Sequence, residues 1–139
     1  MTGSDRRLCQ RTVTAAVLVK NGKILIARRR AGDPLAGCWE FPGGTVESGE
    51  SPEACLAREM KEEFDIDVAI GSFLGESFHH CDDGHIRLLF YRTFWTGGEL
   101  ASMVHDKVAW VTVEKLEHYA FAPADRHFAE RCIKGEITL

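Results

Sequence analysis

Ser51-Pro52 opens the segment that most constrains how this chain can fold, a helix that we predict to run as far as Phe64. A serine side chain accepts a hydrogen bond from a free backbone N–H at a helix start, and proline in the first helical position loses none. Asp65 then stands where helices commonly end in a left-handed residue, a conformation that glycine adopts most readily and aspartate tolerates. The local chemistry therefore bounds this helix at both ends.

The predicted helix has two unlike faces. At about 100° per residue, one side collects the apolar side chains Leu56, Ala57, Met60 and Phe64. A neighbouring side collects the carboxylates Glu59, Glu62 and Glu63. The apolar side predicts packing against a core. On the acidic side, carboxylates spaced three and four residues apart repel one another. This side therefore predicts a bound hard cation such as Mg²⁺, which takes oxygen ligands. The alternative is an acidic surface exposed to solvent.

Strand and turn signals occupy the rest of the chain. Asn21-Gly22, a strong signal for a two-residue hairpin turn, separates the apolar runs 12–20 and 23–28. After a loop over 29–38 comes a short apolar piece, 39–41, which Pro42-Gly43-Gly44 ends. Beyond the acidic helix we predict strands over 68–80, 86–95 and 108–113, a turn at Cys81–Gly84, a short helix over 113–119 and a terminal helix over 125–133. This order predicts an α/β (α+β) fold, with helices packed on a mixed sheet.

Length and composition narrow the class of protein. The 139 residues suit one domain, and we expect a flexible leader over residues 1–11 followed by a single domain over 12–139. The net charge of −4 argues against a nucleic-acid polymer as partner, and the apolar runs are too short to span a membrane. Five cysteines without CxxC spacing favour free thiols and a cytoplasmic protein. We expect a monomer or a homodimer.

A longer motif surrounds the acidic helix. Gly44, five residues, Glu50, seven residues and then the run from Arg58 to Ile66, REMKEEFDI, resemble the Nudix box, GX₅EX₇REUXEEXGU with U apolar. Asp65 in place of the last glycine is the one departure at a fixed position. The stretches 24–29, 39–44 and 122–125 are similar to the MutT and bacterial CTP pyrophosphohydrolase branch of that family. The resemblance implies the Nudix α/β/α sandwich, a mixed β-sheet between helices.

The same resemblance implies an activity and a set of site residues. The activity is Mg²⁺-dependent hydrolysis, with Mn²⁺ as an alternative metal, of a nucleoside triphosphate to a monophosphate and pyrophosphate. The substrate is expected to be a modified, cytosine or guanine nucleotide. The implied catalytic residues are Arg58, Glu59, Glu62 and Glu63. The implied metal ligands are Glu59, Glu62, Glu63 and the Gly43 carbonyl. The implied substrate contacts are Arg29, Glu40, Phe41 and Asp125.

Several roles stay open at the level of sequence. Arg58 is expected to orient the carboxylates, for example by pairing with Glu50, whereas Glu59 and Glu62 are both candidates for the general base. Asp125 has two interpretations. An ionised aspartate accepts hydrogen bonds only, which suits the amino group of cytosine or adenine; alternatively, Asp125 is merely the N-cap of the terminal helix.

Two polar segments lie outside the motif. Several relatives carry a further glutamate at a position that falls on Val104; either the nearby Asp106 replaces it, or His105 and Asp106 are ordinary loop residues and the box ligands act alone. The tract from His79 to His85 is expected to be a polar hairpin end rather than a transition-metal site, because adjacent strand residues point to opposite faces.

Two other functions are the alternatives to a triphosphate pyrophosphohydrolase. One is a Nudix domain that binds nucleotide as a regulatory module without turnover, which loss of box acids would mark; here all of them are present. The other is a Nudix enzyme for ADP-ribose or dinucleotide substrates, which only a comparison of substrates distinguishes.

Overall fold

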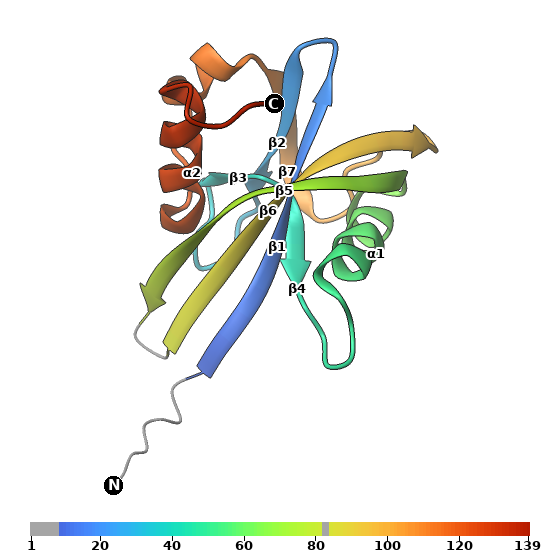
Figure 1. Ribbon diagram of the computed structural model, residues 1–139, viewed down its shortest axis with the longest axis vertical. Helices are drawn as coiled ribbons and strands as arrows, with labels where there is room; N and C mark the ends of the chain where they lie inside the picture. Colours follow the sequence, from blue (N-terminus) through green and yellow to red (C-terminus); the bar gives the residue numbers. More distant parts are fainter. Residues whose placement is uncertain (1–8, 82–83) are drawn as a thin grey trace, which may run out of the picture.

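The computed structural model describes residues 9–81 and 84–139, and it places helices on both sides of a mixed sheet (Figure 1). In chain order the elements are β1 (Cys9–Lys20), β2 (Lys23–Arg29), β3 (Trp39–Glu40), β4 (Gly43–Thr45), α1 (Pro52–Phe64), β5 (Asp67–Cys81), β6 (Gly84–Gly97), β7 (His105–Val111), the 3₁₀ helix η2 (Val113–His118) and α2 (Pro123–Ile133). The predicted fold class is confirmed.

β1 is the strand around which the sheet is organised. Most of it runs parallel to β6, and its residues Val13–Ala15 also pair antiparallel with β4 on the other side. Its last residues form the hairpin with β2, and the strand order is β3-β2-β1-β6-β5, with β7 paired to β2. Because β1 contacts three strands, it positions both β4 and the long β5–β6 hairpin.

Alternate side chains of β1 divide the interior into two layers, as expected for a strand buried on both faces. Ala16 and Leu18 point toward α1, which contributes its apolar side to this layer through Leu56, Met60 and Phe64. Ala15 and Val17 point toward the layer that contains α2. The sheet is thus covered by α1 on one face and by α2 on the other (Figure 1).

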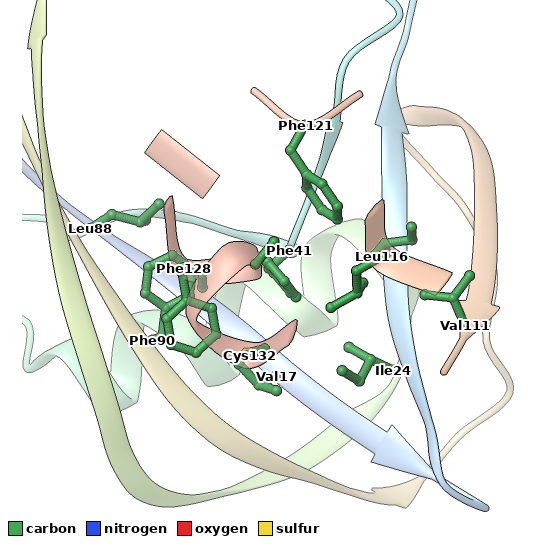
Figure 2. Packing of buried hydrophobic residues seen from close by; sticks show 13 residues of the cluster. Val17, Ile24, Phe41, Leu88, Phe90, Val111, Leu116, Phe121, Phe128 and Cys132 are labelled. Atoms are coloured by element: carbon green, nitrogen blue, oxygen red, sulfur yellow. The ribbon is translucent and has the colours of Figure 1, made fainter. Parts of the chain in front are cut away.

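An aromatic cluster forms the α2 layer. Figure 2 shows the ring of Phe41 lying between Phe121 and the stacked pair of Phe90 and Phe128. The Phe90 and Phe128 ring centroids are 3.8 Å apart, and Phe41 stacks on Phe121 at 5.3 Å. Truncating a buried phenylalanine to alanine typically costs about 3–5 kcal/mol. These contacts therefore fix the segment after β3 against α2.

The ends of α1 are those that the sequence predicts. The Ser51 hydroxyl accepts a hydrogen bond from the Ala54 N–H at 3.1 Å, and Pro52 is the first helical residue. Asp65 adopts a left-handed conformation, with φ of 58°, and its N–H donates to the Lys61 carbonyl. The asparagine–glycine hairpin is confirmed as well, because both Asn21 and Gly22 have positive φ.

Several predicted boundaries need correction. β1 begins at Cys9 rather than residue 12, so residues 9–11 of the expected leader belong to the sheet, while residues 1–8 lie outside the described residues. Residues 43–44 do not end a strand but begin β4, which pairs with β1. α2 begins at Pro123 and its N-cap is Ala122, so the interpretation of Asp125 as an N-cap is wrong. The predicted turn at residues 82–83 lies outside the described residues.

Within residues 9–81 and 84–139, no helix is long and apolar enough to cross a bilayer.

Replacing Asp65 tests the left-handed end of α1. Because glycine adopts this conformation without a Cβ penalty, Asp65→Gly should raise the free energy of unfolding by about 0.5–1 kcal/mol, while Asp65→Ala should lower it. The ion pair that each variant loses, to Lys61 at 3.7 Å, is exposed and contributes little. Urea denaturation measures both values, and a glycine variant less stable than the alanine variant would contradict this explanation.

Candidate active site

A cleft of about 820 Å³ runs between β4, the end of β2, β3 and the start of α2. Most of the residues predicted to form the site line it: Arg29, Glu40, Phe41, Gly43, Glu63 and Asp125. The other predicted residues, Arg58, Glu59 and Glu62, lie on α1 next to Glu63 and outside the cleft wall. The fold therefore brings together residues from four separate parts of the chain, around positions 29, 40–43, 58–63 and 125.

Arg58 is the cation at the centre of the acidic face. Its Nε and Nη2 donate to the two carboxylate oxygens of Glu50 at 2.7 and 3.0 Å, which confirms the predicted pairing. Its Nη1 donates to Glu59 at 3.0 Å and to Glu62 at 3.2 Å. A bidentate guanidinium–carboxylate pair is strong and directional, and it lowers the pKa of Glu50 to about 2. Arg58 thus orients carboxylates from both α1 and the loop before it.

The two glycines of β4 allow close packing on both sides of the strand. A Cβ on Gly44 would overlap the carboxylate of Glu59, and a Cβ on Gly43 would overlap the backbone carbonyl of Thr14. The Thr14 hydroxyl donates to the Gly44 carbonyl at 3.2 Å. Glycine is needed here for proximity, because β4 lies between the acidic helix and β1.

Cys55 packs beneath this contact. Its Sγ lies 3.4 Å from the Thr14 hydroxyl oxygen, and burial raises the pKa of the thiol. A buried thiol with a raised pKa is unreactive, so Cys55 serves as a packing residue. Cys38 and Cys132 are free as well, in agreement with the predicted free thiols.

Glu63 is the box glutamate that faces the cleft. Burial is the main reason that its pKa is raised, to about 9, and the neighbouring carboxyls of Glu59, Glu40 and Glu62 raise it further. A carboxyl in this position is stabilised in its neutral form by desolvation and by nearby negative charge. Where the acidic face meets the cleft, the carboxyl of Glu63 therefore keeps its proton to higher pH than an exposed glutamate does.

The donor set around Glu63 fits a hard divalent cation. Three glutamates within about one helical turn supply oxygen ligands of the kind that Mg²⁺ takes. The crowding that raises the pKa of Glu63 is crowding that a cation would relieve. Among the described residues, no three His, Cys, Asp or Glu side chains already converge in the geometry of a metal site, since Glu59 and Glu62 are hydrogen-bonded to Arg58.

The guanidinium of Arg29 forms ion pairs with carboxylates of the protein itself. Its Nε and Nη2 donate to both oxygens of Asp33 at 2.8 and 2.9 Å, and its Nη1 donates to Glu40 at 2.8 Å. The other Glu40 oxygen lies 2.8 Å from Nε2 of His105. Arg29 and Glu40 both line the cleft, but any contact of Arg29 with a nucleotide must share the guanidinium with Asp33.

His105 is a cleft residue that the sequence did not identify. Instead of lying in a loop, it begins β7, its side chain is only 5% exposed, and its ring stacks on Phe64 of α1 with centroids 5.4 Å apart. The antiparallel pairing of β7 with β2 places it opposite Arg29 and beside Glu40. No local pattern in the sequence signals this pairing, because it joins residues far apart in the chain.

Asp106 does not occupy the position of the additional glutamate found in relatives. Its carboxylate accepts a hydrogen bond from Nε of Arg28 at 2.7 Å in an exposed ion pair, which lowers the pKa of Asp106. Val104 and His105 line the cleft, whereas Asp106 does not. Among the described residues, Asp106 is therefore directed to Arg28 and away from the cleft that Glu63 lines.

Asp125 is a buried cleft residue in the first turn of α2. Its Oδ1 accepts a hydrogen bond from the Phe41 N–H at 3.0 Å, so it links the start of α2 to the segment after β3. Burial raises its pKa well above the usual value, and Glu40 raises it further. A carboxyl in such surroundings is neutral over a wider pH range than an exposed one.

The histidines of the β5–β6 hairpin point in different directions. His79 lines the cleft, while the rings of His80 and His85 pack against each other with centroids 4.2 Å apart. This arrangement agrees with the predicted polar hairpin end. The side chains of Cys81, Asp82 and Asp83 lie outside the described residues.

Comparison with known proteins gives a consistent result. The pattern that defines the NUDIX domain matches residues 10–132. The chain is 38% identical over 117 residues to a putative 8-oxo-dGTP diphosphatase 2 of Mycobacterium tuberculosis, covering 82% of each chain. It is 35% identical over 113 residues to the CTP pyrophosphohydrolase of Escherichia coli, covering 81% of this chain and 84% of that one. The solution structure of the E. coli ORF135 protein is similar with a TM-score of 0.79 and 32% identity, over 92% of this chain and 91% of that one.

Substituting the two glycines of β4 separates a structural role from a functional one. Gly44→Ala forces only the flexible end of Glu59 to move, so the protein should fold while kcat falls by at least about tenfold. In Gly43→Ala the new Cβ would overlap the Thr14 backbone, which cannot move aside as a side chain can. This substitution should lower the free energy of unfolding by about 1–3 kcal/mol, the cost typical of overpacking a core. Circular dichroism and steady-state kinetics measure the two effects, and normal turnover in Gly44→Ala would show that the position of Glu59 is not critical.

Proposed function

This chain belongs to the Nudix hydrolase family, and on that premise we propose that it is an Mg²⁺-dependent nucleoside triphosphate pyrophosphohydrolase that prefers cytosine nucleotides, including modified ones. One observation carries the proposal: a single cleft joins the box glutamate Glu63 and the glycines of β4 to the buried carboxyl of Asp125. One end suits phosphates with their counter-cation, and the other suits a nucleobase. A nucleotide spans both.

At the phosphate end, the proposed ligands are Glu59, Glu62, Glu63 and the Gly43 carbonyl. A bound divalent cation supplies charge neutralisation of the phosphate oxygens and lowers the pKa of the attacking water. Arg58 keeps the carboxylates oriented, and the glycines let the phosphate chain approach the β4 backbone closely. Glu59 and Glu62 are both candidates to accept the proton of the water.

At the base end, Asp125 supports a preference for cytosine. A neutral carboxyl offers one acceptor and one donor, which complement the adjacent amino group and ring nitrogen of cytosine. An ionised carboxylate offers acceptors only, which complement the two neighbouring N–H donors of guanine. Burial raises the pKa of Asp125, so the neutral form persists to higher pH than in an exposed aspartate, and we propose that this form binds the base. The amino-group contact expected from the sequence is kept in this proposal, but with a neutral acid rather than an ionised one.

The relatives support a triphosphate substrate without selecting the base. One is named for an oxidised guanine nucleotide and the other for CTP. The decisive experiment is therefore a panel that contains CTP, dCTP, 5-methyl-dCTP, 8-oxo-dGTP, ADP-ribose and a diadenosine polyphosphate. We expect pyrophosphate release to be fastest with cytosine nucleotides. Faster hydrolysis of ADP-ribose or the dinucleotide than of any triphosphate would refute the proposed substrate class.

The box acids provide a first specific prediction. Glu62→Gln and Glu63→Gln should each lower kcat by at least about 100-fold, equivalent to roughly 2.7 kcal/mol of transition-state stabilisation. Glu53→Gln on the exposed first turn of the same helix is the matched control and should leave kcat unchanged. Exhaustive chelation should abolish wild-type activity and added Mg²⁺ should restore it. Full activity in the presence of chelator would contradict the metal-dependent mechanism.

The protonation state of Asp125 provides a second prediction. Asp125→Asn keeps one acceptor and one donor and still accepts the Phe41 N–H, so kcat/KM for CTP should stay within about threefold of wild type. Asp125→Leu, of similar size, should lower it by about tenfold or more, as expected when a polar partner is lost.

The pH dependence checks the same assignment. The neutral acid is the competent form, so the wild-type enzyme should keep its preference for CTP below the raised pKa of Asp125 and lose it as the pH rises through that value. Asp125→Asn does not titrate, so the ratio of its kcat/KM to that of wild type should rise with pH. A ratio that is flat across the range would indicate that Asp125 does not titrate during base recognition.

A further inference from the structure

His105 is buried in the wall of the cleft, and all of its hydrogen bonding is directed to one partner. Its side chain is only 5% exposed. Its Nε2 lies 2.8 Å from Oε2 of Glu40, and because a carboxylate only accepts, Nε2 carries the hydrogen of this bond. Within residues 9–81 and 84–139, its Nδ1 is the only buried side-chain nitrogen or oxygen without a hydrogen-bond partner. The polar role of the ring therefore rests on Glu40.

Packing alone does not explain a histidine at this position. The ring stacks on Phe64 of α1 with centroids 5.4 Å apart and planes only 11° from parallel. A phenylalanine would make the same contact and would leave no nitrogen buried and unpaired. An unpaired polar atom in the interior destabilises the folded protein. The feature that histidine adds to an apolar ring here is the hydrogen bond to Glu40.

Glu40 is fixed by bonds from two other strands. It lies on β3, opposite Ala27 of β2, and Arg29 at the end of β2 donates to its Oε1 at 2.8 Å. His105, the first residue of β7, donates to its Oε2. A carboxylate offers about four acceptor sites, so about two stay available to the donors of a ligand.

The carboxyl of Glu40 lies near the other acids of the cleft. Burial raises the pKa of both Glu63 and Asp125, and the charge of Glu40 raises each of them further. Phe41, the next residue in the chain, donates its N–H to Asp125. All of these residues line the cleft together with His105. A carboxylate there suits a hydroxyl or amino group of a ligand, since it has acceptors and no donor.

We propose that His105 is a positioning residue, whose Nε2–H holds the Glu40 carboxylate in the orientation that accepts hydrogen bonds from a hydroxyl or amino group of the nucleotide. This rests on the proposed function, since it takes the cleft to be the nucleotide site. Arg29 fixes one carboxylate oxygen and His105 fixes the other. Without His105, the carboxylate keeps its bond to Arg29 but turns about it.

Two variants separate the hydrogen bond from the packing. His105→Phe keeps a ring against Phe64 and loses the bond, whereas His105→Gln keeps an amide donor near the position of Nε2 and loses the ring. His105→Phe should raise KM for CTP by about tenfold with kcat within about twofold, while His105→Gln should keep KM within about threefold of wild type. His118→Phe replaces an exposed histidine that does not line this cleft and is the matched control, with wild-type kinetics.

Thermal unfolding followed by circular dichroism shows whether the kinetic effect is merely structural. The melting temperature should be higher for His105→Phe than for His105→Gln, because phenylalanine keeps the stacking on Phe64. The variant with the higher melting temperature should therefore be the one with the higher KM. If KM were instead higher for His105→Gln, the ring contact rather than the hydrogen bond would matter, and the proposal would be wrong.

A double-mutant cycle tests whether His105 acts through Glu40. Glu40→Ala should itself raise KM, and in that background His105→Phe should raise KM by less than about twofold further. A tenfold increase in both backgrounds, or an unchanged KM in His105→Phe alone, would overturn the proposal. An effect of His105→Phe on CTP but not on dCTP supports a contact with the 2′-hydroxyl, and an equal effect on both supports a contact with another donor. Wild type that releases no pyrophosphate from any triphosphate would instead refute the proposed function.

Discussion

The hydrogen bonds of Arg58 are the interaction on which the site depends. One guanidinium binds both oxygens of Glu50, from the loop before α1, and one oxygen each of Glu59 and Glu62, from α1 itself. Without that cation, the carboxylates on one helical face would repel one another and turn toward solvent. The same guanidinium reaches the Thr45 carbonyl at 3.3 Å, so it also ties the helix to β4. The position of the acids relative to the glycines follows from this one residue.

β1 connects the acidic helix to the rest of the fold. Its two faces belong to two different hydrophobic layers, one under α1 and one under α2. Between those layers it pairs with β4 on one edge and β6 on the other, so the acidic helix and the α2 end of the cleft share a single rigid support. A site held on packed strands and helices keeps its geometry better than one carried by loops. α1 and α2 therefore both pack on the same sheet.

Several charged side chains that line the cleft pair with one another. Arg29 is shared by Asp33 and Glu40, and Glu40 is shared in turn by His105. Burial raises the pKa of the Asp125 carboxyl, which also lines the cleft. Arg29, Asp33, Glu40 and His105, all of which line the cleft, are thus joined in one network.

The sequence alone determined the features that depend on near neighbours in the chain. The capped helix from Pro52 to Phe64, the hairpin at Asn21-Gly22 and the order of the box acids follow from turn chemistry and helical spacing, which act over a few residues. The tertiary structure decided the rest. The pairing of β4 with β1, the burial of His105 against Glu40, the diversion of Asp106 to Arg28 and the contact of Asp125 with the Phe41 N–H all join residues distant in sequence. Whether a carboxyl at position 125 caps a helix depends on where the helix begins, and the packing of α2 on the sheet places that start at Pro123.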